Sequence, residues 1–164
     1  MTTLENPFAK VRQKLVAARL EVMSQLAKFH HDELTQAPAP GEWSALQLAY
    51  HVYVADGLAL EQMCQVQEED NPLVEVLDEK TPRLTREGEP PTSLEAVLAG
   101  MAARREEIFE YLSVLAPEAW ERPFRHPEWG QLKFYQLVNI LALHDRAHAQ
   151  QLAEVKAVIV LARS

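Results

Sequence analysis

Cysteine is almost missing from this sequence: Cys64 is the only one among 164 residues. A lone thiol cannot form a disulfide within the chain, and a zinc site made from several cysteines is excluded as well. We expect Cys64 to serve as a small buried apolar residue.

Long hydrophobic runs are also missing. The longest, AVIVLA near the C-terminus, is far shorter than the ~20 residues that a membrane-spanning helix needs. The first residues, MTTLENPFAK, lack the basic region and apolar block of a secretory signal. We therefore expect a cytoplasmic protein that does not bind membranes.

Positive charge is in short supply. The 16 lysines and arginines face 24 aspartates and glutamates, which gives a formal net charge of −8, and the basic residues form no dense cluster. Such a surface repels phosphate backbones and anionic lipids. Nucleic acid is therefore not an expected partner, and a damage-response factor that binds nucleic acid is disfavoured.

No segment alternates apolar and polar residues at period two, so we predict no β-sheet. Apolar residues instead recur every three or four positions in four segments, which start at Pro7, Ser44, Thr92 and about Leu132. The first should end near His31 and the second near Glu69, while the fourth continues into the C-terminal tail. These segments predict an all-α fold, a single four-helix bundle domain over residues 1–164.

Capping boxes mark two of these helix starts. Ser44 with Gln47, and Thr92 with Glu95, place a hydroxyl and a carbonyl-bearing side chain three residues apart, where they satisfy exposed backbone N–H groups. No comparable signal precedes the fourth segment, so its start is the least defined.

Two histidines lie on the inward-facing stripe of the fourth segment. His144 and His148 are one helical turn, about 6 Å, apart on one face. Burying two imidazoles removes water from both, and a shared divalent cation would compensate for this loss. His51, on the inward stripe of the second segment, supplies a third ligand. We predict a metal site made of His51, His144 and His148; ordinary core histidines are the alternative.

The heights of these histidines bear on the topology. His51 lies about two turns into its helix, whereas His144 and His148 lie in the second half of theirs. An up-down-up-down bundle would separate them by on the order of 10 Å along the axis. An up-down-down-up bundle brings them level, and it needs a long crossover between the second and third helices. Residues 71–91 can reach ~65 Å, against ~36 Å for a 24-residue helix.

The remaining histidines have simpler explanations. We expect His30 and His31 to be solvated at the end of the first helix, where cationic side chains favour the helix dipole. His126 lies in a proline-flanked loop, where it either approaches the metal or caps a backbone group.

Short motifs resemble the DinB/YfiT family of metal-binding four-helix bundles. They are GEWSALQLAYHV, which holds Trp43, Ser44 and His51, and LALHDRAHAQQL, which holds His144, His148 and Gln151. The stretch HPEWGQLKFYQLV resembles the loop before the family's last helix. The resemblance implies the up-down-down-up topology, a divalent ion on three histidines, a homodimer and a link to stress response. It also implies metal-dependent transferase or isomerase activity that uses a low-molecular-weight thiol.

Three neutral imidazoles leave coordination positions open to water or substrate, and they suit zinc, nickel, iron or copper. We expect zinc or nickel first, with iron or manganese as alternatives. The predicted function is a thiol-dependent S-transferase or isomerase, or a hydrolase, acting on a small molecule. A non-catalytic, stress-related metal-binding or scaffold bundle is the alternative.

Catalytic residues beyond the metal ligands are not identified by the sequence. We expect Asp56 and Glu61 on the surface, with a role as general base as the alternative, and Asp145 facing outward or toward a neighbouring helix. Arg104 and Arg105 are expected as surface arginines with buried stems, and the alternative is that they clamp a substrate carboxylate. Aromatic residues are expected to pack or to anchor loops, with substrate contact or the roof of a pocket as the alternative: Trp43, Tyr50, Tyr53, Trp120 and Trp129.

Overall fold

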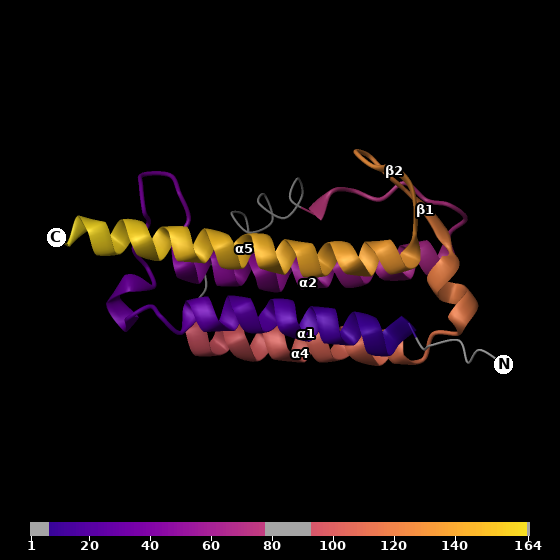
Figure 1. Cartoon of the computed structure of the whole chain (residues 1–164), viewed down its shortest axis with the longest axis horizontal. Coiled ribbons are helices and arrows are strands. Elements are labelled where there is room, and N and C mark those ends of the chain that lie inside the picture. Colours follow the sequence, from indigo (N-terminus) through magenta and orange to yellow (C-terminus); the bar gives the residue numbers. More distant parts are fainter. Residues whose placement is uncertain (1–6, 78–92, 164) are drawn as a thin grey trace.

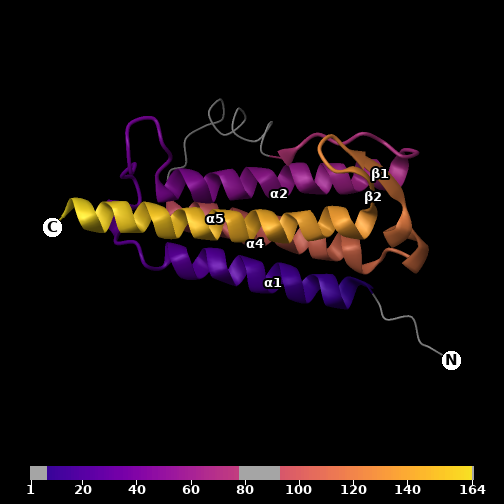
Figure 2. The same cartoon turned by 45° about the horizontal axis from the view of Figure 1, so that its top comes forward.

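The computed structural model describes residues 7–77 and 93–163. Four long helices lie side by side: α1 (Pro7–Leu26), α2 (Ala45–Glu68), α4 (Leu94–Ser113) and α5 (Phe134–Ala162) (Figure 1). The expected four-helix bundle is confirmed. Figures 1 and 2 show α1 and α5 running in one direction and α2 and α4 in the other. None of the described helices is both long and apolar enough to cross a membrane.

The helix starts follow local hydrogen bonding. At α2 the predicted capping box is present, because Gln47 N donates to Ser44 Oγ and Ser44 N donates to Gln47 Oε1. At α4 the predicted cap was wrong by one residue: Ser93 Oγ accepts from Ala96 N at 3.1 Å. Thr92 lies outside the described residues.

The first helix ends earlier than expected, at Leu26 instead of His31. The chain then turns, and Phe29 and Leu34 become buried in the core on either side of the short 3-10 helix η1 (His31–Glu33). Glu33 Oε1 accepts from His30 N at 2.7 Å, so a side chain takes over the role of a helical carbonyl.

A small β-hairpin precedes α5, so the prediction of no sheet was wrong. Strands β1 (Pro123–His126) and β2 (Gly130–Lys133) pair antiparallel after the 3-10 helix η2 (Pro117–Glu121), with His126 opposite Gly130. Four-residue strands are too short to give a clear alternating pattern. The turn is closed by Gly130, whose φ of 74° few other residues adopt.

The hairpin is bonded to the chain that leaves α2. Val74 N donates to Arg125 O at 3.0 Å, and Arg125 N donates to Pro72 O at 2.8 Å. The Arg122 side chain donates to Val66 O in the last turn of α2 and to Glu69 O just after it. These bonds join the end of α2 to the connection before α5.

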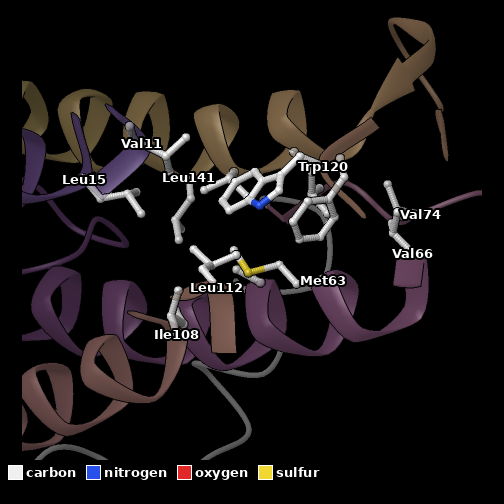
Figure 3. Close-up of a cluster of buried hydrophobic side chains, with 14 of the residues drawn as sticks. Val11, Leu15, Met63, Val66, Val74, Ile108, Leu112, Trp120 and Leu141 are labelled. Atoms are coloured by element: carbon white, nitrogen blue, oxygen red, sulfur yellow. The ribbon is translucent and has the colours of Figure 1, made fainter. Parts of the chain in front are cut away.

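Buried apolar side chains form two clusters along the bundle. The first lies toward the hairpin, and Figure 3 shows some of its members: Leu15, Met63, Ile108, Leu112, Trp120 and Leu141. The second lies toward the start of α2 and includes Val22, Leu48, Met101 and Leu152. On each of the four helices, members of the two clusters are separated by a charged residue.

These charged residues, one from each helix, form a buried ion cluster of Arg19, Asp56, Arg105 and Asp145. Arg19 contacts Asp56 at 2.9 Å and Asp145 at 3.2 Å. Arg105 Nη2 contacts the same two carboxylates at 2.9 and 3.0 Å. Both aspartates are 0% exposed. Each carboxylate therefore has two arginine partners, which compensates for its lost hydration.

The ion cluster corrects two expectations from the sequence. Asp56 and Arg105 were expected at the surface, and both are buried because they pair across the bundle. Asp145 faces neighbouring helices, one of its two expected orientations. Burial alone would lower the pKa of Arg19, but Asp56 and Asp145 outweigh this effect and the pKa is raised.

A third buried carboxylate, Glu33, is held by cations from α5 and its C-terminal end. Lys156 Nζ donates to Glu33 Oε1, and Arg163 Nη1 lies 3.2 Å from Glu33 Oε2. The hydrogen bond from Lys156, together with that from His30 N and the charge of Arg163, lowers the pKa of Glu33 from 4.5 to about 2.

We expect Asp56→Asn to lower the free energy of unfolding by about 3 kcal/mol or more, because it leaves the buried Arg105 and the partly buried Arg19 with one carboxylate between them. Urea unfolding followed by circular dichroism measures this loss. Glu61→Gln, a change at an exposed carboxylate on the same helix, should alter stability by less than about 0.5 kcal/mol. Equal unfolding midpoints for the two variants would contradict the role of the ion cluster.

The lowered pKa of Glu33 predicts a pH-dependent contribution to stability. The folded state keeps this carboxylate ionised, so its contribution is complete above the ordinary pKa and is lost as the pH falls toward about 2. The stability difference between the natural protein and Glu33→Gln should therefore shrink between about pH 5 and about pH 2. Unfolding free energies measured across this range test it, and a constant difference would contradict the prediction.

Candidate metal centre

The three predicted histidines come together in the middle of the bundle. His51 lies in the second turn of α2, and His144 and His148 lie on successive turns of α5. His51 Nε2 is 3.0 Å from His148 Nε2, which is 3.1 Å from His144 Nε2. The three side chains are nearly buried, with exposed fractions of 1%, 7% and 9% for His51, His144 and His148.

This arrangement fits a shared cation. One ligand nitrogen from each histidine lies within 4.8 Å of the other two. Two nitrogens bonded to one ion at about 2.1 Å and at a right angle would be about 3.0 Å apart, close to the observed separations. Within residues 7–77 and 93–163, no other group of three or more His, Cys, Asp and Glu side chains comes close enough to share an ion.

Gln151 orients one of the rings. It lies one turn beyond His148 on α5, and His148 Nδ1–H donates to Gln151 Oε1 at 2.9 Å. With the proton on Nδ1, the lone pair of Nε2 points toward the other two histidines. An outer partner of this kind fixes the tautomer of a metal-binding histidine and makes it a stronger ligand.

Trp43 covers His51 from the chain entering α2. The two ring centroids are 4.8 Å apart, with an angle of 45° between the planes. Trp43 was expected to pack at the start of this helix, and it does so directly against one of the three histidines. It thereby limits the freedom of the His51 ring and the access of water on that side.

The histidine group adjoins the ion cluster. Asp145 directly follows His144 on α5, and Asp56 lies five residues after His51 on α2. Sequence reasoning missed Arg19, which completes this ion cluster from α1. The available signal was a charge inside an apolar stripe, between buried Ala18 and Val22.

The other histidines lie outside this group. His126 is buried, its Nδ1 accepts from the backbone N–H groups of Glu128 and Trp129, and its ring stacks on Trp129 at 4.5 Å. It therefore caps the hairpin turn, one of the two roles expected for it. His30 and His31 are exposed, as expected.

The candidate polar residues on α2 and α4 have structural contacts. Arg104 donates to the Tyr53 hydroxyl at 3.3 Å and lies over the Tyr53 ring, and this hydrogen bond raises the pKa of Arg104. Tyr50 stacks on Tyr53 at a centroid distance of 6.1 Å. Glu61 is exposed, as expected. None of these contacts identifies a general base.

Trp120 and Cys64 occupy the part of the bundle near the hairpin. Trp120 is 1% exposed and packs edge-on against Phe134, so it anchors the connection before α5. Cys64 is half-buried, which is less than expected. Burial and the neighbouring Cys64 thiol raise the pKa of Tyr111.

Chemically, the centre offers three imidazole nitrogens and no carboxylate ligand among the described residues. Such a donor set holds a divalent transition-metal ion and leaves coordination positions for water or substrate.

Known proteins resemble this chain in sequence and in fold. Uncharacterized protein YuaE of Bacillus subtilis (strain 168) is 25% identical over 152 residues, covering 85% of this chain and 93% of YuaE. The structure of YfiT from Bacillus subtilis, described as a probable metal-dependent hydrolase with an unusual four-helix bundle topology, matches with a TM-score of 0.71 and 15% identity. The match covers 96% of this chain and 90% of YfiT.

A mycothiol-dependent maleylpyruvate isomerase shares the fold as well. Its TM-score is 0.61 at 17% identity, and the match covers 93% of this chain and 63% of the isomerase. The family model of the DinB superfamily matches residues 13–152, which include all three clustered histidines. The chain therefore belongs to the DinB superfamily.

Proposed function

We propose that this protein is a metal-dependent enzyme of the hydrolase type, in which His51, His144 and His148 bind a divalent cation. The observation that carries the proposal is the convergence of three nearly buried Nε2 atoms. The likeness in fold to YfiT, described as a probable metal-dependent hydrolase, supports the choice of reaction. Zinc or nickel as the ion, a homodimer and a role in stress response remain predictions.

The chain's own residues would hold this centre in a fixed geometry. A bound divalent cation would act as a Lewis acid and lower the pKa of a coordinated water or thiol. Gln151 keeps the His148 lone pair pointed inward, and Trp43 shields His51. Pairing of Asp145 with two arginines fixes the position of α5 beside His144.

A thiol-dependent transfer or isomerisation is the second candidate. It is supported by the likeness in fold to the mycothiol-dependent isomerase. Both reactions would use the same three histidines, so replacing a histidine does not tell them apart. Assaying ester hydrolysis and thiol conjugation side by side shows which of the two reactions the protein catalyses. A bundle stabilised by a purely structural metal would instead unfold when a chelator removes the ion.

The tag-free protein should bind about one equivalent of zinc or nickel, and His51→Ala, His144→Ala and His148→Ala should each lose most of it. Elemental analysis after dialysis measures the metal content. His31→Ala, a change at an exposed histidine outside the group, is the matched control.

The natural protein loaded with metal should hydrolyse activated esters such as p-nitrophenyl acetate, and turnover no higher than that of His51→Ala would count against a hydrolase.

Gln151→Ala should weaken metal binding about 10- to 100-fold while all three ligands remain, because His148 loses the partner that fixes its tautomer. Competition with a chromogenic chelator gives the affinity. Gln150→Ala is a suitable control, since Gln150 is exposed on the neighbouring position of α5. Equal affinities for both variants would show that Gln151 does not support the centre.

A further inference from the structure

A pocket of about 450 Å³ lies at the end of the bundle where α2 begins. It is an open hollow between the chain that leads into α2 and the C-terminal half of α5, which Figure 1 shows beside each other. Its lining residues are Pro38, Gly41, Glu42, Trp43, Gln151, Glu154, Val155 and Val158. A volume of this size accommodates a small organic molecule.

This pocket shares a wall with the histidine group. Trp43 lines the pocket and packs against His51. Gln151 also lines it and bonds to His148. Two lining residues therefore contact the histidine group, one at His51 on α2 and one at His148 on α5. A molecule in the pocket would lie next to the candidate metal centre.

The charged residues that line the pocket are both acidic. Glu42, from the chain that leads into α2, and Glu154, from α5, both line it, and no lysine, arginine or histidine is among the described residues that line it. Lys156, two positions further along α5, is engaged by Glu33. Besides Gln151 and Gly41, the other lining residues are apolar or aromatic, and Trp43 offers a surface on which a cation or an aromatic ring can rest.

We propose that this pocket binds the substrate of the metal centre, and that the substrate is a small amine with an apolar or aromatic body. The inference rests on the proposed function. Two carboxylates on an already acidic protein attract a cationic group and repel an anionic one. The apolar side chains between them take the body of the molecule, which brings its reactive group to the wall formed by Trp43 and Gln151.

A matched pair of probes tests the charge preference. Calorimetry at about pH 7 should show 2-phenylethylamine binding at least about tenfold more tightly than 3-phenylpropionate, a molecule of similar size and opposite charge. Glu42→Gln and Glu154→Gln should each weaken amine binding about two- to fivefold. Glu110→Gln removes the same charge from an exposed site near the end of α4 and should leave amine binding unchanged.

Quenching of tryptophan fluorescence by the amine locates the site, because this signal should be lost in Trp43→Phe and kept when Trp129 is replaced by phenylalanine. Equal affinity for amine and acid, no detectable amine binding, or amine binding unaffected by Glu42→Gln and Glu154→Gln would each overturn the proposal.

Metal content is measured on the same samples. If the protein binds zinc but not the amine, the proposed amine site is wrong and the metal-dependent function stands. If it binds the amine but not zinc, the metal-dependent function is wrong and the amine site stands.

Discussion

Four paired charges inside the bundle, the partly buried Arg19 with the buried Asp56, Arg105 and Asp145, control how the helices align along its axis. Each helix contributes one of them, and each carboxylate contacts two arginines. Sliding a helix by one turn, about 5.4 Å, would move its charge into an apolar cluster and cost the two oppositely charged side chains one of their two partners. Apolar packing alone tolerates such shifts more easily, so the ion cluster fixes the relative heights of the helices.

The histidine group depends on that alignment. His51 comes from α2 and His148 from α5, so the 3.0 Å separation of their Nε2 atoms exists only when the two helices are level, whereas His144 lies one turn before His148 on α5. The ion cluster and the histidines together form a polar layer between two apolar clusters. A polar layer in mid-bundle costs stability compared with a continuous apolar core, and its retention is consistent with a functional role.

Much of this arrangement could be predicted from the sequence, because it follows from regular spacing. The period of 3.6 gave the four helices, and the four-residue separation of His144 and His148 placed both on one inward face. The sequence wrongly predicted Asp56 and Arg105 at the surface. Their ion-pair partners lie on other helices, and a charged residue whose partner cannot be recognised in the sequence is normally expected at the surface. The hairpin was missed because its strands are four residues long, and the end of α1 because Phe29 and Glu33 make tertiary contacts that local periodicity does not reveal.

The hydrogen bonds between the hairpin and the chain leaving α2 make the connections at the two ends of the bundle different. Val74, Arg125 and Arg122 link two connections that are distant in sequence, so α2 and α5 are fastened together where one ends and the other begins. At the opposite end, the chain between α1 and α2 bounds an open hollow beside α5. Glu33, in that same chain, is tied to Lys156 and Arg163, so the hollow lies between two elements that ion pairs hold together, whereas the hairpin end is joined by backbone hydrogen bonds.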